Sequence, residues 1–299
     1  MLRGAISILL LLIAGYVAQG QEVTLYVIPP PAPMNWRSPG ALLVSYIKSL
    51  TAKNKYVKHR HPMGHVVVEL RDSSRFVVAG IVAESKADVA YRVYVKGYGM
   101  GILFTPLRGK MEVGDVNANE LSERLKNGDV AYIRFRVSNE AFNRLWQYLN
   151  EYKERGYDRV YNGANKPREG KGAGCSSFGL SFIELAGLLP QVETDKWKVS
   201  VNVPEKLIGG PERSNKWIGL HKIILKSKWA DTTRQSYRKI AYYEPYFMYK
   251  WIAAAWADSN LSIKKKYTKE QRESAKGLLI DCAECTLPGD EIWLQGGKK

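Results

Sequence analysis

One cysteine follows a glycine-rich loop and opens a helical pattern, a position that suits a nucleophilic thiol. Glycines stand at positions 170, 172 and 174, and apolar residues then recur at helical spacing at Phe178, Phe182, Leu185 and Leu189. Cys175 lies on this stripe in the first turn, where unpaired backbone N–H groups and the helix dipole favour the thiolate. We expect Cys175 to be a reactive nucleophile; a buried structural cysteine is the alternative.

A thiol nucleophile needs a proton acceptor, and the chain contains four histidines, His59, His61, His65 and His221. His59 and His61 fall in a basic loop and are expected at the surface, and His221 is expected near a strand edge. His65 follows a glycine and opens an apolar strand, so its ring can face the helix that carries Cys175. We therefore expect His65 to be the base, with a packed core histidine as the alternative.

The first 20 residues have the pattern of an export signal. Arg3 supplies a positive charge, residues 6–14 give a short apolar core, and Ala18-Gln19-Gly20 is a small-x-small cleavage site. The apolar run is shorter than the roughly 20 residues that span a bilayer. We expect a mature protein from about Gln21, exported to the periplasm or secreted; an uncleaved N-terminal anchor is the alternative.

The other two cysteines, Cys282 and Cys285, form a Cys-x-x-Cys motif near the C-terminus. In an oxidising compartment they are the natural candidates for a local disulfide. A redox role lacks the thioredoxin-like strand–helix context, and zinc would need two further ligands from the four histidines. Cys175 is left unpaired, and a free thiol in an exported protein is best explained by chemistry.

The chain is strongly basic, with 45 lysines and arginines against 29 aspartates and glutamates and a formal net charge of +16. In an exported protein this charge points to an anionic surface, such as a cell-wall polymer, lipid headgroups or an acidic polysaccharide. We do not expect a nucleic-acid partner. The charge exceeds what solubility alone requires.

Hydrophobic periodicity and turn residues predict an α+β protein. We expect strands over residues 23–28, 63–70, 75–84, 89–96, 99–105 and 130–137, and helices over 40–53, 119–127, 138–156 and from 175 to 187. A signal peptide over residues 1–20 would precede a catalytic domain over residues 21–190. Residues 191–299 are basic and rich in aromatic residues, and we expect them to pack on the catalytic domain as an extension.

Two motifs stand far apart in the chain, GHVVVEL at residues 64–70 and GCSSF at residues 174–178. Together they resemble the circularly permuted NlpC-type papain-like cysteine hydrolases, with a lecithin:retinol-acyltransferase-like layout, because the histidine precedes the cysteine. The resemblance covers roughly residues 60–190. It implies an antiparallel sheet packed against the cysteine-bearing helix. It also implies acyl chemistry on amide or ester bonds through a thioester, with Cys175 as nucleophile, His65 as base, and no metal or cofactor.

The family's third, orienting polar residue usually lies on the strand paired with the histidine strand, and here the pattern departs. A turn at residues 73–74 places Val82 opposite His65, and a turn at 72–73 places Gly80 there. Neither can orient an imidazole. Glu84 falls on the same face, diagonally opposite at about 7–8 Å, and is the expected orienting residue. A three-residue loop would bring Ser85 to that face instead, and a backbone carbonyl or a Cys–His dyad is a further alternative. Backbone N–H groups at 175 and at Ser176 are expected to form the oxyanion hole.

Three hypotheses for the function follow. The first is an exported cysteine hydrolase of the peptidase or amidase type, acting on cell-wall peptide or another amide bond. The second is a lipid-directed acyltransferase or phospholipase that uses the same Cys175–His65 pair. The third is a catalytically idle binding module for an anionic polymer, in which Cys175 is unreactive.

Overall fold

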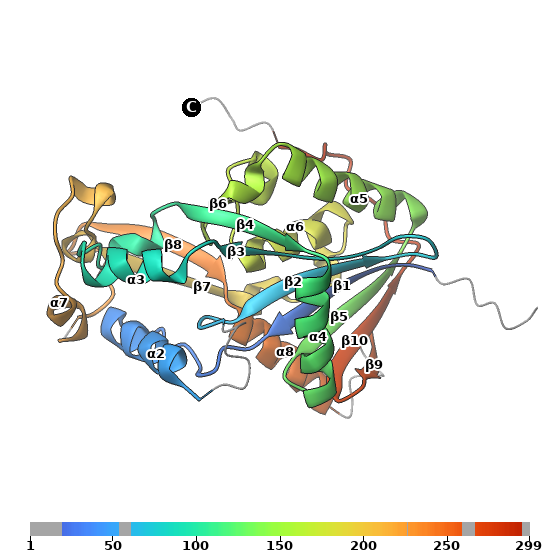
Figure 1. The fold of residues 1–299 in the computed structure, drawn as a ribbon, viewed down its shortest axis with the longest axis horizontal. Helices are drawn as coiled ribbons and strands as arrows, with labels where there is room; N and C mark the ends of the chain where they lie inside the picture. The colour runs from blue at the N-terminus through green and yellow to red at the C-terminus, as the bar shows by residue number, and fades with distance from the viewer. Residues whose placement is uncertain (1–19, 54–60, 226, 259–266, 295–299) are drawn as a thin grey trace, which may run out of the picture.

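The computed structural model describes residues 20–53, 61–225, 227–258 and 267–294 of an α+β protein built on one large sheet (Figure 1). The eight strands lie in the order β6-β4-β3-β2-β1-β5-β10-β9. Their bounds are β1 (Gln21–Ile28), β2 (His65–Arg71), β3 (Phe76–Ala83), β4 (Leu107–Val113), β5 (Ala131–Val137), β6 (Val160–Tyr161), β9 (Tyr267–Arg272) and β10 (Ala275–Cys282).

The sheet is mixed rather than antiparallel as predicted. Neighbouring strands run antiparallel except β5 and β10, which are parallel. The parallel pair contains β10, which comes from residues 191–299. These residues were expected to pack on the catalytic domain as an extension. That region instead adds the β9–β10 hairpin to the sheet itself. Residues 21–190 and residues 191–299 therefore contribute strands to one sheet.

Helices cover the two faces of the sheet unequally. Val66, Val68 and alternate residues of the other strands pack against three helices, α5 (Asn139–Glu154), α6 (Cys175–Leu185) and α8 (Pro245–Ala257). We call this side the α6 face. On the opposite side, Val67, Tyr26 and Tyr132 pack against Leu121 of α4 (Asp115–Asn127). We call this side the α4 face. The alternation of side chains along each strand makes neighbouring residues contribute to different faces.

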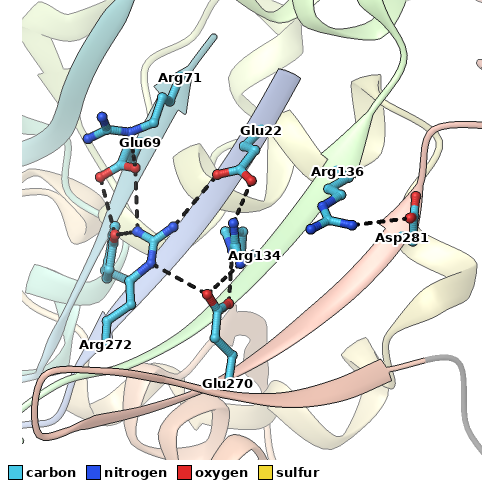
Figure 2. A network of polar contacts seen from close by, with 9 residues as sticks. Glu22, Glu69, Arg71, Arg134, Arg136, Glu270, Arg272 and Asp281 are labelled. Carbon is cyan, nitrogen blue, oxygen red and sulfur yellow. Dashed lines mark hydrogen bonds and ion pairs between the residues drawn. The ribbon is translucent and has the colours of Figure 1, made fainter. Parts of the chain in front are cut away.

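Beside α4, the α4 face carries a network of ion pairs (Figure 2). Arg134 binds both Glu22 and Glu270, and the Arg272 guanidinium lies 3.5 Å from Glu69 and 3.7 Å from Glu22. Buried or half-buried charges are stable only when they are paired in this way. The network therefore links β1, β2, β5 and β9 across the sheet, and both arginines have carboxylate partners.

A second core forms at one end of the molecule, where α2 (Pro39–Thr51), α3 (Lys86–Tyr94) and α7 (Leu220–Ile224) lie (Figure 1). The antiparallel pair β7 (Lys198–Pro204) and β8 (Tyr237–Tyr243) contributes to it. Its buried residues include Leu42, Met100, Val201, Ile223 and Ile240. α2 begins one residue before its predicted start, and the Ser38 side chain caps it by accepting a hydrogen bond from the Ala41 N–H. None of the helices in the described ranges is long and apolar enough to cross a bilayer.

Several expected elements are confirmed and two are wrong. β1, the β2–β3 hairpin, β5, α2, α5 and α6 form close to their predicted places. Residues 89–96 and 99–105 were expected as strands but form most of α3 and a 3-10 turn over Met100–Leu103. The Ser85 side chain accepts a hydrogen bond from the Asp88 N–H and so begins a helix before the apparent strand pattern. His221, expected near a strand edge, lies in α7.

Candidate active site

Cys175 is the first residue of α6, as the sequence predicts, and forms no disulfide. The Ser177 side chain caps the helix by accepting a hydrogen bond from the Gly174 N–H at 3.1 Å. A Cβ atom on Gly174 would come within 2.6 Å of the Gly163 Cα, so only glycine allows this close approach of the two loops. The glycines before Cys175 thus serve to seat its loop against residues 160–163.

The Cys175 thiol lies where two strands separate. β2 pairs with β1 along its whole length, but it pairs with β3 only over residues 68–71. The rest of β3 pairs with β4 instead. Val66 lies in the part of β2 that does not pair with β3, and its backbone N–H donates a hydrogen bond to the Cys175 sulfur. The gap between β2 and β3 therefore supplies the thiol with a backbone donor.

Burial raises the pKa of the Cys175 thiol above its ordinary value. Only 7% of the residue is exposed. Hydrogen bonds from the Val66 N–H, the Tyr161 hydroxyl (3.9 Å from the sulfur) and Ser176 act in the opposite direction but do not offset the loss of water. The expectation that the helix N-terminus would favour the thiolate is wrong for this conformation, because desolvation outweighs the donors.

The structure places His65 on the face of the sheet opposite the helix that carries Cys175. His65 pairs with Ile28 on the α4 face, whereas α6 packs over the next residue, Val66, on the other face. The His65 ring stacks on His61, with ring centroids 4.2 Å apart. Its Nε2 atom lies 3.0 Å from where a Cβ on Gly80 would be. Within the described ranges, no hydrogen bond joins Cys175 to His65; the thiol's side-chain partners are Tyr161 and Ser176.

His61 was expected at the surface, but its side chain is only 10% exposed. Its Nε2 lies 3.1 Å from Oε1 of Glu120 on α4, and Nε of Arg124 lies 2.6 Å from the same oxygen. Burial raises the pKa of the Glu120 carboxyl, but the hydrogen bonds and charges of His61 and Arg124 outweigh it and leave the pKa lowered. The four-residue spacing of Glu120 and Arg124 in the sequence could have predicted their ion pair. The contact between Glu120 and His61, which are 59 residues apart, could not be predicted in this way. His59 lies outside the described residues.

Glu84 does not orient His65. β3 ends at Ala83, and the Glu84 side chain is 46% exposed. Its carboxylate lies 3.0 Å from Nε of Arg108, which follows the first residue of β4. The prediction is wrong because the next strand offers the carboxylate a solvent-exposed cationic partner.

Cys175 and His65 both line one cavity of about 290 Å³, although they approach it from opposite faces of the sheet. Most of the lining is apolar and comes from α2, α3 and the segments after them. It includes Leu42, Leu43, Tyr46, Val89, Ala90, Val93, Met100, Ile102, Leu103 and Ile223. Concave apolar sites with a few polar groups are the usual form of small-molecule sites. The lining is suited to an apolar chain with one polar or reactive end.

Glu244 is a site residue that sequence reasoning missed. Its Oε2 caps α8 by accepting a hydrogen bond from the Phe247 N–H at 2.8 Å, and it lines the same cavity as Cys175. Among the described residues, its Oε1 is buried and has no hydrogen-bond partner. Burial raises the pKa of Glu244 to about 7, despite hydrogen bonds from the Phe247 and Tyr246 N–H groups. Helix N-caps usually carry Ser, Thr, Asp or Asn, which have shorter side chains. The glutamate at this N-cap was therefore the one signal in the sequence that could have pointed to a special role.

Cys282 and Cys285 lie at disulfide distance from each other at the end of β10, where the sequence predicts a bond between them. Within the described ranges, no group of three or more histidine, cysteine, aspartate or glutamate side chains is arranged to hold a metal ion.

Comparisons of this chain with protein-family models, with curated proteins and with solved structures found no match.

Proposed function

We propose that the protein is a cysteine-dependent acyl hydrolase or acyltransferase that acts on a substrate with an apolar acyl group. One observation carries the proposal: a free cysteine at the N-terminus of α6 lies in the wall of a mostly apolar cavity. The lining favours the lipid-directed hypothesis over cleavage of a cell-wall peptide, because a peptide needs many polar partners when it is buried. The apolar side chains would hold the acyl group while the carbonyl meets the thiol.

The papain-like resemblance is part of this proposal. Helix α6 packs on the sheet beside β2, the strand that carries His65, which supports a permuted papain-like arrangement. The face on which His65 lies departs from that arrangement. Export also remains a proposal; residues 1–19 lie outside the described part, and β1 begins at Gln21.

In the proposed reaction the Cys175 sulfur attacks the carbonyl carbon of an ester or amide and forms a C–S bond. Backbone N–H groups at the start of α6, including that of Ser176, would stabilise the oxyanion. The bond to the leaving alcohol or amine breaks as that group takes a proton. Water or an acceptor alcohol then attacks the thioester, releases the acyl group and returns the proton to the sulfur.

Glu244 is our proposed proton acceptor, in place of His65. A Cβ on Gly64 would lie 2.7 Å from Pro245, so Glu244 sits beside the start of β2, where Val66 donates to the Cys175 sulfur. A carboxyl group with a pKa near 7 can both accept and return a proton at neutral pH. His65 would have to leave its stack on His61 and cross the sheet to take the same role.

Hydrolysis of p-nitrophenyl esters of increasing acyl length tests the proposal. Wild-type protein should prefer long chains, and Cys175→Ala should be inactive. Ala90→Phe, which fills part of the cavity from α3, should lose long-chain activity and keep short-chain activity. Glu244→Gln should lower the rate far more than His65→Ala. Equal activity in wild type and Cys175→Ala, or no effect of Ala90→Phe on chain preference, would contradict it.

A second candidate, a non-catalytic carrier of an apolar ligand, is favoured by the raised pKa of the Cys175 thiol and by the position of His65 on the face of the sheet opposite α6. In that case the cavity would bind a fatty acid, and Cys175→Ala would bind it equally well. No ester would be hydrolysed by either protein.

A further inference from the structure

Exposed apolar side chains gather at the end of the molecule formed by α2, α3 and α7. Of the eleven large hydrophobic residues that the described chain exposes, seven lie there, which is too many for an even scatter. We call them the apolar end surface: Val44, Tyr91, Tyr94, Val95, Trp217, Ile224 and Leu225. Leu225 is 68% exposed, Val95 58% and Trp217 55%. Clustered exposure of this kind marks an interaction site, whereas single exposed hydrophobic residues need no explanation.

Direct contacts hold the elements of this surface together. The Trp217 indole N–H lies 3.3 Å from the Val95 carbonyl oxygen, which fixes the tryptophan beside the end of α3. A Cβ on Gly40 would lie 2.9 Å from the Ile224 carbonyl oxygen, so the start of α2 sits against α7. The same three elements line the cavity that contains Cys175. The apolar end surface is therefore continuous with the elements that enclose the proposed acyl site.

The surface is also basic. Residues 216–228 contain four lysines and no acidic residue, and Lys216, Lys222 and Lys228 are exposed. On α2, Lys48 is exposed and no acidic residue occurs. On α3, the carboxylate of Asp88 is already paired with Arg92 at 2.9 Å, and Lys96 remains exposed. A surface with apolar side chains and unbalanced lysines matches a partner that offers both an apolar layer and negative charge.

We propose that this end of the protein docks on an anionic lipid bilayer. The apolar end surface would enter the boundary between headgroups and acyl chains, and the lysines would lie near the lipid phosphates. A hydrophilic anionic polymer would attract the lysines but would leave Leu225, Val95 and Trp217 in water. The docking rests on the proposed function only in its last step, in which a membrane lipid supplies the acyl chain to the cavity.

Vesicle flotation with the full mature chain tests the docking. The protein would carry Cys175→Ala, so that catalysis plays no part in the result. We expect binding to vesicles of phosphatidylglycerol and phosphatidylcholine, at least tenfold weaker binding to phosphatidylcholine alone, and weaker binding as salt rises. The pair Val95→Ser and Leu225→Ser should reduce binding at least tenfold. The matched pair Val116→Ser and Phe76→Ser, exposed residues elsewhere, should leave it unchanged.

A charge variant keeps the test decisive if the apolar variant folds poorly. Lys216→Gln with Lys222→Gln should weaken binding to anionic vesicles several-fold, whereas Lys126→Gln on α4 should not. Binding that is equal in both apolar pairs, or binding to heparin with none to vesicles, would overturn the docking. Its failure is distinct from failure of the proposed function, because acylation of Cys175 by a soluble ester needs no vesicle.

Discussion

Replacing Glu244 by glutamine should change how the stability of the protein depends on pH. Glutamine keeps the oxygen that caps α8 but cannot ionise. In the wild type, burial raises the pKa of the carboxyl from 4.5 to about 7, so the folded state binds this proton more tightly than the unfolded state. The stabilisation is fully present below pH 4.5 and is lost as pH rises toward 7.

The size of the effect follows from the shift. A rise of about 2.5 pKa units corresponds to roughly 3 kcal/mol at about 1.4 kcal/mol per unit. The free energy of unfolding in urea should be measured for both proteins from pH 4 to pH 8. The difference, wild type minus Glu244→Gln, should fall by about 3 kcal/mol across this range, and other titrating groups cancel in it. A difference that stays constant with pH would refute the burial of a carboxyl with one unpartnered oxygen at this site.

Three further outcomes are expected. Cys175 should alkylate slowly at pH 7 and about tenfold faster for each pH unit up to 9, because its pKa is raised and only the thiolate reacts; a rate that is already maximal below pH 7 would contradict this. Glu84→Ala should change the free energy of unfolding by less than about 1 kcal/mol and leave esterase activity intact, because its ion pair with Arg108 is exposed; a large loss of activity would restore it to the site. His61→Ala should lower the free energy of unfolding by about 1–3 kcal/mol in urea titrations, because it removes a partner of the buried Glu120; an unchanged midpoint would mean that the contact contributes nothing.

Local sequence patterns were enough to predict the elements that carry the site. Three features can be recognised from neighbouring residues alone: the cap at Ser38, the turn at Asp72 and the apolar stripe of α6. In the turn, the Asp72 carboxylate accepts hydrogen bonds from the Ser74 and Arg75 N–H groups. Such features depend on contacts within a few positions of the chain. They fixed the place of Cys175 at the start of a helix and of His65 at the start of a strand.

The relation between Cys175 and His65 depended on long-range packing. Strand alternation shows that His65 and Val66 lie on opposite faces, but it does not show which face α6 will cover. That choice is made by contacts such as Gly179 against Val66, where a Cβ would lie 2.6 Å from the valine side chain. The buried pairing of His61 with Glu120 and the free oxygen of Glu244 likewise arise only when distant segments meet.

The central claim is that Cys175 attacks an acyl carbonyl held in the apolar cavity. Intact-protein mass spectrometry after incubation with a long-chain p-nitrophenyl ester at pH 8 tests it most directly. We expect a mass increase of one acyl group, located on Cys175 by peptide mapping, removed by hydroxylamine and absent from Cys175→Ala. An unmodified Cys175 in a protein that still binds the acyl chain, or an adduct that forms equally in Cys175→Ala, would contradict it.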